Sequence, residues 1–375
     1  MAGRLGARTN WTTSAVKQLY NPKINLINME KIKCIKFPKI EQFRNVVSTI
    51  LRQSTFVGLD DHGDAIYDST KRKPTLVFKG SVKLHGTNAG VSYNDKFGLW
   101  TQSRNNAFTL DRHDSCMGFT FFVNSHRELF ESFIKDLAER NNVDTSKFCI
   151  TIFGEWAGKG IQKSVAISEI DKSFFIFGVK VSNPDDESFN SLWLDHSGIR
   201  SNENKIYNIL DFPTFEVEID FNMPQLVQNV LGDITQKIED ECPVGKHFGH
   251  SGVGEGVVWS CDLDGTRHSF KVKGTKHSVS KVKTLAPVNV EKLNSIQEFV
   301  DYSVTRVRFE QGLGEIFSSP EEYDTKRTGD ILRWIVNDIM SEEMDVLVEN
   351  GLTPKDVNKY VSTRAREMFF KEIGI

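Results

Sequence analysis

Cysteines, long apolar runs and net charge are all scarce in this 375-residue sequence. The five cysteines are an odd number without CxxC spacing, which argues against a disulfide framework and for a reducing compartment. No stretch approaches the roughly 20 apolar residues of a membrane-spanning helix. A net charge of -3 means that any nucleic-acid site must come from local clustering of basic residues. The absence of a GxxxxGKS/T segment excludes the corresponding phosphate-binding loop.

The first 29 residues differ from the rest because they contain basic residues but no Asp or Glu. This composition fits a mitochondrial transit peptide, a disordered leader or translation that starts at Met29. Since apolar periodicity is weak there, we expect a leader over residues 1–30, a cytoplasmic protein, and full activity in a chain that begins at Met29. Mitochondria are the alternative compartment.

Short β-rich runs separated by Gly, Asn and Asp fill residues 31–285 and predict a mostly antiparallel α+β domain. They include 75–84, 89–94, 97–103, 148–156, 173–181, 255–261 and 268–274. One helix is expected at 123–140, with Asn124 or Ser125 as its cap. Its apolar face would contain Leu129, Phe130, Phe133, Ile134 and Leu137.

Helical periodicity replaces the strand pattern after residue 286 and predicts a separate all-α domain over 286–375. One stripe consists of Ile331, Leu332, Ile335, Val336, Ile339 and Met340. Thr353 and Pro354 predict the start of a last helix, whose apolar face would contain Val357, Tyr360, Val361, Ala365, Met368 and Phe369. We expect this domain to help engage a substrate.

The segment Lys83-Leu84-His85-Gly86-Thr87-Asn88 follows an apolar strand. Strand alternation places Lys79, Ser81 and Lys83 on one face, and Gly86 allows the backbone to approach a ligand closely. An isolated match of this kind is most simply a surface lysine before a turn, so its meaning depends on the other segments.

A second group of polar residues lies at strand ends further along the chain. Glu155 comes near the end of the apolar strand CITIFGEW, where a carboxylate can accept hydrogen bonds from a ribose or bind a metal. In the following strand, Phe175 and Phe177 share one face, which could stack on a base, although a core role is the simpler interpretation.

Glu255 stands between two glycines at the start of the strand that follows. Its GxGxG spacing and the strand after it exclude a dinucleotide-binding fingerprint. Lys271 and Lys273 share one face of the next strand, where two cations predict a bound anion; Lys281 and Lys283 lie nearby. A zinc site formed by Cys242, His247, His250 and Cys261 matches no standard finger, and a polar loop is favoured there.

Together these segments resemble the ordered motifs of covalent nucleotidyltransferases. Within that superfamily, KLHGTN, FGEWAGKGIQ and FKVKG are similar to the RNA ligase 2 family of phage ligases and kinetoplastid editing ligases. The resemblance covers about residues 75–285. It implies an ATP-grasp-like domain of antiparallel sheets and an ATP-dependent RNA ligase that joins 3′-OH and 5′-phosphate ends.

The resemblance also implies a role for each motif residue. Lys83 would take AMP from ATP, and His85, Asn88 and Arg104 would lie near the transferred phosphate. Glu155 would hold the ribose and Phe177 would stack on adenine. Glu255 would help bind Mg²⁺ or Mn²⁺, and Lys271 and Lys273 would contact the α-phosphate. For attack, Lys83 must lose its proton, so we expect burial and neighbouring cations to lower its pKa.

Two positions depart from the family pattern. Val82 replaces a frequent acid, and Gly178 replaces a frequent Asp after the stacking phenylalanine, which leaves the choice between Phe175 and Phe177 open. The alternatives to an RNA ligase are a DNA ligase or GTP-dependent capping enzyme on the same fold, and a non-catalytic RNA-binding derivative. The expected partner is RNA with 5′-phosphate and 3′-OH ends, without a membrane, and the expected state is a monomer.

Overall fold

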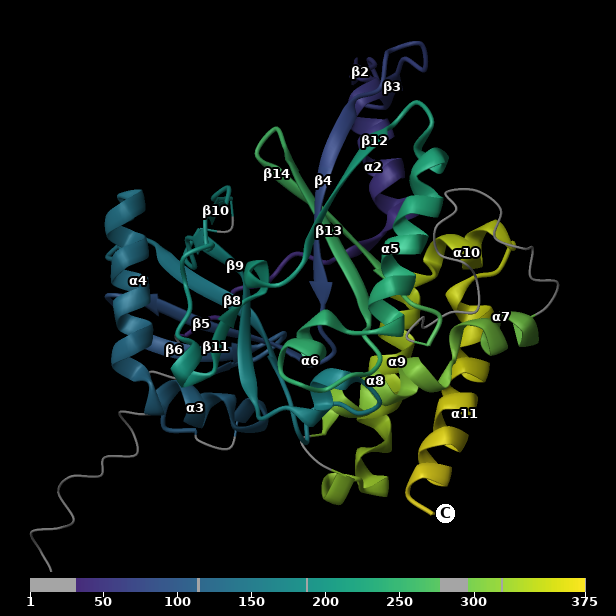
Figure 1. Cartoon of the computed structure of the whole chain (residues 1–375). Helices are drawn as coiled ribbons and strands as arrows, with labels where there is room; N and C mark the ends of the chain where they lie inside the picture. Colours follow the sequence, from purple (N-terminus) through teal and green to yellow (C-terminus); the bar gives the residue numbers. More distant parts are fainter. Residues whose placement is uncertain (1–31, 113–114, 187, 277–295, 318–319, 375) are drawn as a thin grey trace, which may run out of the picture.

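Two β-sheets and a group of C-terminal helices make up the computed structural model of the chain (Figure 1). The structure describes residues 32–112, 115–186, 188–276, 296–317 and 320–374. The leader and the lysines at 281 and 283 therefore lie outside the described residues. Across the described ranges, no helix is both long enough and apolar enough to cross a membrane.

The five-stranded sheet has the order β1-β14-β13-β4-β12. Its strands are β1 (Glu41–Gln42), β4 (Thr75–Lys83), β12 (Thr214–Asp220), β13 (Gly256–Leu263) and β14 (Thr266–Lys273). Residues of β4 and β14 alternate between a more buried and a less buried side, because side chains in a strand point alternately to opposite faces. Phe78, Val82, Phe270 and Val272 are buried on one side, so Lys83, Lys271 and Lys273 project from the other.

The larger sheet contains seven strands in the order β10-β9-β8-β5-β6-β7, with β11 paired to β9. They are β5 (Thr87–Asn94), β6 (Gly98–Ser103), β7 (Ala107–Phe108), β8 (Cys149–Ala157), β9 (Ser173–Ser182), β10 (Leu192–Leu194) and β11 (Ile206–Asn208). In the two larger sheets of the described chain, only β1–β14 and β9–β11 pair in parallel. The prediction of a mostly antiparallel α+β fold is confirmed.

The helix expected at 123–140 is instead two helices, α3 (Phe119–Ser125) and α4 (Arg127–Asn141). His126 separates them, with φ -120° and ψ 28°, and neither expected residue caps α4. The Ser125 hydroxyl donates to the Phe121 carbonyl instead. The break allows Phe119 and Phe130, from different helices, to pack on the same ring of Phe174.

Three further helices pack beside the sheets, although few helices were expected before residue 286. These are α2 (Phe43–Thr55), α5 (Gln228–Asp240) and α6 (Pro243–His247). The apolar stripe of α2 is Phe43, Val46, Val47 and Ile50. Phe43 packs 5.0 Å from the ring of Phe270 on β14, so α2 covers the buried face of the five-stranded sheet.

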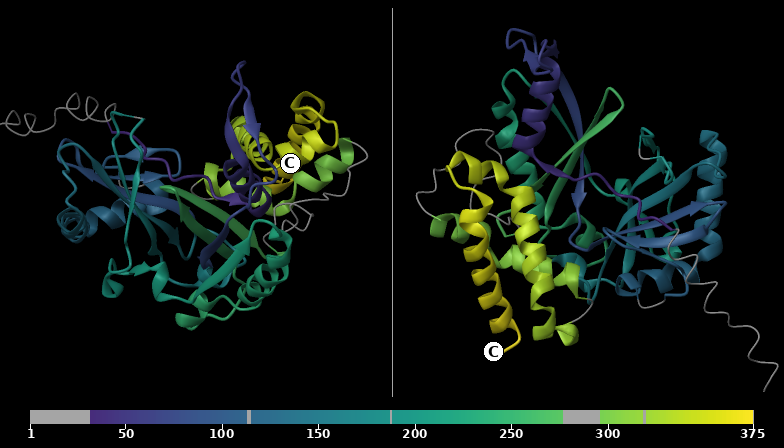
Figure 2. Two further views of the ribbon diagram at one scale, coloured as in Figure 1. Left: turned by 90° about the horizontal axis from the view of Figure 1, so that it is seen from above. Right: turned by 180° about the vertical axis from the view of Figure 1, so that it is seen from behind.

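We call residues 296–374 the helical cap. It contains α7 (Ile296–Ser303), α8 (Arg306–Ile316), α9 (Thr328–Glu342), α10 (Met344–Glu349) and α11 (Pro354–Glu372), and the views from above and behind place it against the five-stranded sheet (Figure 2). The predicted capping by Thr353 and Pro354 is present. On α11, Val357, Val361, Ala365 and Phe369 are buried as expected, but Tyr360 is 49% exposed and does not belong to the packed face.

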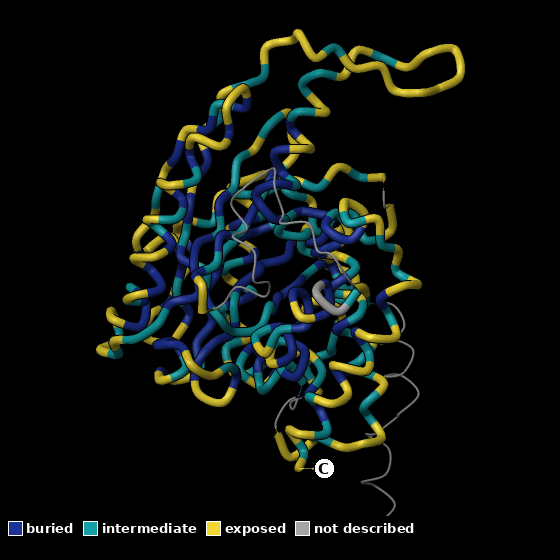
Figure 3. Tube along the Cα trace, turned by 90° about the vertical axis from the view of Figure 1, so that its right-hand side faces the viewer, coloured by how far each residue is buried: buried dark blue, intermediate teal, exposed yellow. Residues whose placement is uncertain are grey.

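A two-stranded hairpin, β2 (Phe56–Leu59) and β3 (Ala65–Tyr67), projects from the body after α2. It is drawn at the top of Figure 3, where most of its length is exposed. Its apolar side chains Phe56, Leu59 and Ile66 are more than 40% exposed. The hairpin lies away from the pocket described next.

Candidate active site

Lys83, Lys271 and Lys273 meet in one pocket because β13 lies between β4 and β14. Gly256 is paired with Lys83 on one side and with Lys273 on the other. It has φ 149°, and a Cβ there would lie 2.1 Å from the Val272 carbonyl oxygen. Glycine is therefore required at the position that separates the two lysines.

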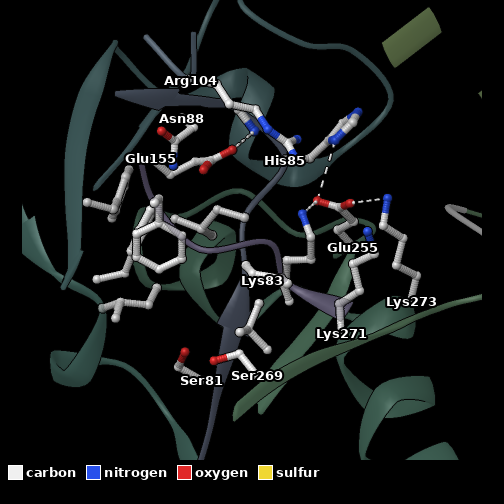
Figure 4. A pocket seen from close by; sticks show the side chains of 18 of the residues that line it. Ser81, Lys83, His85, Asn88, Arg104, Glu155, Glu255, Ser269, Lys271 and Lys273 are labelled. Atoms are coloured by element: carbon white, nitrogen blue, oxygen red, sulfur yellow. Dashed lines mark hydrogen bonds and ion pairs between the residues drawn. The ribbon is translucent and has the colours of Figure 1, made fainter. Parts of the chain in front are cut away.

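Glu255 lies at the centre of this group of cations (Figure 4). Its Oε2 is 2.7 Å from Lys83 Nζ and 3.4 Å from His85 Nδ1. Its Oε1 is 3.0 Å from Lys273 Nζ. Burial alone would raise the pKa of Glu255, but Lys83, Lys273 and His85 outweigh burial and hold it well below the usual range. The carboxylate is therefore ionised.

The pKa of Lys83 differs from the sequence-based expectation. Burial lowers this pKa, but the carboxylates of Glu255 and Glu155 outweigh burial, so the net pKa lies above the ordinary lysine value. The pKa of Lys273 is instead shifted downward, the direction that was expected for Lys83. Burial lowers the pKa of Lys273 to about 8 against the attraction of Glu255, and the charges of Lys83 and Lys271 lower it further. Because its own pKa is raised, Lys83 is a protonated amine in the ligand-free protein.

Glu155 connects the Lys83 segment to the seven-stranded sheet. Its Oε1 accepts a hydrogen bond of 2.9 Å from the backbone N–H of Gly86, and it pairs in register with Asn88 across β5 and β8. A Cβ at residue 86 would lie 2.4 Å from the Trp156 carbonyl oxygen. Burial raises the pKa of Glu155 to about 7, although the charge of Lys83 opposes this shift.

Two aromatic rings of β9 reach the pocket from the seven-stranded sheet. Phe175 is 0% exposed and stacks 5.3 Å from Tyr207 in the core. Phe177 is only partly buried, and its ring lies 5.1 Å from that of Phe37. A Cβ at Gly178 would be 3.2 Å from Trp193, so a larger residue would crowd that ring.

All nine predicted site residues line this one pocket, including His85, Asn88 and Arg104. The structure also adds residues that sequence reasoning missed. The helical cap contributes Gln311, Glu315, Trp334, Asp338 and Glu342, and the segment before β1 contributes Phe37, Pro38 and Ile40. A signal for the cap residues was present, because 311 and 315 on α8, and 334, 338 and 342 on α9, recur at the four-residue spacing of one helix face.

The most direct contact between the cap and the strands joins Glu342 to Lys271. Glu342 Oε1 lies 3.0 Å from Lys271 Nζ, and the two side chains are only 7% and 20% exposed. Burial raises the pKa of Glu342, but Lys271 outweighs burial and lowers it to about 2. The cap therefore presents a permanent negative charge to the pocket.

The carboxylates near Lys83 are suitable for a divalent cation that arrives with a ligand. Glu255 offers oxygen donors, which Mg²⁺ and Mn²⁺ prefer. Within the part of the chain that the structure describes, no three His, Cys, Asp or Glu side chains form a ready-made metal cluster. This includes the region of Cys242, whose Sγ accepts from the Gly245 N–H at 3.5 Å.

A sequence model of the family described as RNA ligase matches residues 78–273, more than half of the 375-residue chain. The matched range includes Lys83, Glu155, Glu255 and Lys273. The chain belongs to the RNA ligase family.

Solved structures of a ligase from Naegleria gruberi show a distant similarity. The chain is 15% identical to Naegleria gruberi RNA ligase with PPi, over 66% of this chain and 60% of that chain, with a TM-score of 0.38. A lysine-to-alanine mutant of that ligase with ATP and Mn shares 16% identity over 64% and 56%, with a TM-score of 0.39. The chain thus spans about 60% of the first structure's length. No curated protein gives a significant match.

Proposed function

We propose that the protein is an ATP-dependent RNA ligase that works through a covalent lysyl-AMP intermediate. Lys83 Nζ attacks the α-phosphorus of ATP, and pyrophosphate leaves. The AMP then passes to the 5′-phosphate of an RNA, and a neighbouring 3′-OH attacks that phosphate, seals the strand and releases AMP. The observation that carries the proposal is the convergence of Lys83 and Lys273 on the buried carboxylate of Glu255, in a pocket that Lys271 also lines.

The ligand-free geometry implies how Lys83 becomes a nucleophile. Only the neutral amine can attack phosphorus, whereas Glu255 and Glu155 hold Lys83 protonated. When the Glu255 carboxylate no longer pairs with Lys83, one of the two carboxylates that raise the pKa of Lys83 is withdrawn, and burial then lowers this pKa with less opposition. The proton can then leave to solvent before attack.

The other residues hold the nucleotide in this proposal. Lys271 and Lys273 contact the α-phosphate and stabilise charge that develops during transfer. Phe177 stacks on adenine, since its ring is less buried than that of Phe175. Glu155 binds the ribose, and His85, Asn88 and Arg104 lie near the transferred phosphate.

Glu255 and the phosphate oxygens of ATP would hold Mg²⁺ or Mn²⁺ together, because such ions are commonly bound by one or two carboxylates and the substrate's own phosphates. A bound ion would supply positive charge at the reacting phosphate. We propose RNA as the polynucleotide partner, a monomer as the working state, and the cytoplasm as the compartment, with mitochondria as the alternative.

Labelled nucleotides test the proposal directly. Wild-type protein should acquire label from α-labelled ATP that survives denaturing electrophoresis, and it should join nicked RNA more readily than nicked DNA. Lys83→Ala should lose labelling completely, whereas Lys79→Ala, an exposed lysine on the same face of β4, should keep it. Labelling of a folded Lys83→Ala protein would contradict the assignment. Labelling by GTP alone would indicate a capping enzyme instead.

A further inference from the structure

The two sides of the pocket have opposite charge. Among its described lining residues, the strands and their loops provide five cations, Lys83, Arg104, Arg267, Lys271 and Lys273, and two carboxylates, Glu155 and Glu255. The helical cap provides three carboxylates, Glu315, Asp338 and Glu342, and no Lys or Arg. Without the cap the lining is clearly positive, as a polyphosphate requires, whereas the docked cap adds negative charge, above all at Glu342, because Asp338 is already paired with Arg308.

Glu342 takes the place that an anionic ligand would take on Lys271. A carboxylate resembles a phosphate in offering negatively charged oxygens to an ammonium group. Its oxygen is 3.0 Å from Lys271 Nζ, and its pKa of about 2 means that ordinary changes of pH do not remove the charge. A phosphate that binds Lys271 must therefore compete with Glu342 for this ammonium group.

Residues before α2 hold the end of α9 in this position. Lys39 Nζ donates to the Ser341 carbonyl at 2.6 Å, and Gln42 Nε2 donates to Glu342 Oε2 at 3.4 Å. Gln42 is itself the register partner of Lys271 between β1 and β14. The docking of α9 and the position of its carboxylate are therefore fixed by the same short segment.

A second set of contacts holds the cap mainly through residues outside the pocket lining. Arg44 donates to Asp345 Oδ1 at 3.0 Å and to the Glu342 carbonyl at 3.3 Å, and its Nη2 lies 3.5 Å from Glu343 Oε2. Arg44 and Asp345 are not among the lining residues. Cap docking can thus be weakened at Asp345 while the pocket chemistry stays intact.

We propose that the docked helical cap is autoinhibitory: Glu342 competes with the phosphates of the nucleotide for Lys271, and ATP binds by displacing the end of α9. This inference rests on the proposed function, because it takes the pocket to be the ATP site. ATP binding and release of the cap are then one coupled equilibrium. The phosphates of ATP, and not its adenine base, displace Glu342.

Glu342→Gln in the full chain separates charge from shape. We expect it to bind inorganic tripolyphosphate about tenfold more tightly than wild type, the scale of one charge-assisted hydrogen bond. Adenosine, which has no phosphate, should bind both proteins equally. Asp345→Asn should also tighten tripolyphosphate binding, but less. Glu367→Gln, which removes a charge from the surface pair with Arg364, should change neither affinity. Isothermal titration calorimetry measures all of these.

The results distinguish this inference from the proposed function. If wild type takes label from ATP but Glu342→Gln binds tripolyphosphate no more tightly, the autoinhibitory contact is wrong and the ligase assignment stands. If neither folded wild-type protein nor a folded variant takes label from ATP, the proposed function fails. Should Glu342→Gln not fold, Asp345→Asn provides the test, and unchanged tripolyphosphate affinity in that variant would overturn the inference.

Discussion

The strands form one side of the pocket, the strand side, and the helical cap forms the other, the cap side. The two sides differ in the spacing of their pocket residues along the chain. On β4 and β14, polar residues alternate with buried ones, so Lys83, Lys271 and Lys273 face the ligand while Val82 and Val272 fill the core. On α9 the pocket residues recur every fourth position, and the helix buries Ile331, Ile335 and Ile339 on another face.

This difference also separates two kinds of stabilisation. The cations of the strands are held by a backbone ladder and a buried core, so they persist when a ligand is absent. The helices of the cap have a buried core of their own, but polar contacts such as those of Glu342 with Lys271 and Asp345 with Arg44 join the cap to the strand side. Within the cap, the most buried ion pair joins Arg308 to Glu343 at 3.0 Å, with both side chains 0% exposed. The cap side should therefore be the part of the pocket that yields to substitution or to a ligand.

Substitution of Arg308 should have the largest effect on stability, because it breaks a fully buried ion pair. The effect should be confined to the cap side. Arg308 also lies 2.8 Å from Asp338, so Arg308→Met removes this partner from Asp338 and leaves the buried Glu343 with Arg44 at 3.5 Å and the Tyr302 hydroxyl. Breaking a buried pair in this way costs about 3–5 kcal/mol. We expect amide exchange in α9 to accelerate accordingly while exchange in β13 is unchanged.

Arg306→Met is the matched control, because Arg306 pairs with Glu310 at the exposed surface of the cap and such pairs contribute less than about 1 kcal/mol. Equal acceleration of α9 exchange in both variants would show that the buried ion pair stabilises the cap no more than the exposed one does.

The strand side is tested by the two lysines of β14. Lys271→Ala and Lys273→Ala should each slow self-adenylylation about 100-fold or more, the usual result of removing one group that stabilises transferred charge. Lys281→Ala and Lys283→Ala should instead weaken RNA binding and reduce its salt dependence. Label transfer and RNA affinity at two salt concentrations measure the two effects. An equal loss of adenylylation in all four variants would remove the distinction.

The smallest effect concerns pH. Because the pKa of Lys273 is about 8 in the ligand-free protein, this lysine is charged below that pH and neutral above it. Tripolyphosphate affinity should therefore fall as pH rises through this value, by at most about tenfold per pH unit.

Lys273→Arg keeps its charge throughout this range, so it should lack this component of the fall. The ionisation of tripolyphosphate itself is common to both proteins, and the difference between them reports Lys273. Parallel pH profiles for the two proteins would contradict the lowered pKa.

The strand side was predictable from the sequence because each motif is a local pattern. Lys83 follows an apolar strand, and Lys271 and Lys273 alternate with Phe270 and Val272. A few neighbouring residues are therefore enough to predict which side chains face the pocket. The break at His126 was not predictable from periodicity, since apolar residues continue across it.

The cap side could be predicted as helix but not as part of the pocket. Its apolar stripes indicate helices, yet only the docking by Arg44 and Gln42 places Glu342 on Lys271. The protonated state of Lys83 was missed for a similar reason. Its neighbours on the strands are cations, and the deciding carboxylate of Glu255 comes from a residue 172 positions away.

That separation along the chain has a consequence for protein synthesis. The ribosome makes Lys83 first and must add 172 more residues before Glu255 exists, roughly ten to thirty seconds at ordinary elongation rates. Until β13 and β14 emerge, the nascent chain contains Lys83 but lacks Glu255, Lys271 and Lys273. On the proposed function, we therefore expect a partly synthesised chain not to react with ATP until the five-stranded sheet can form.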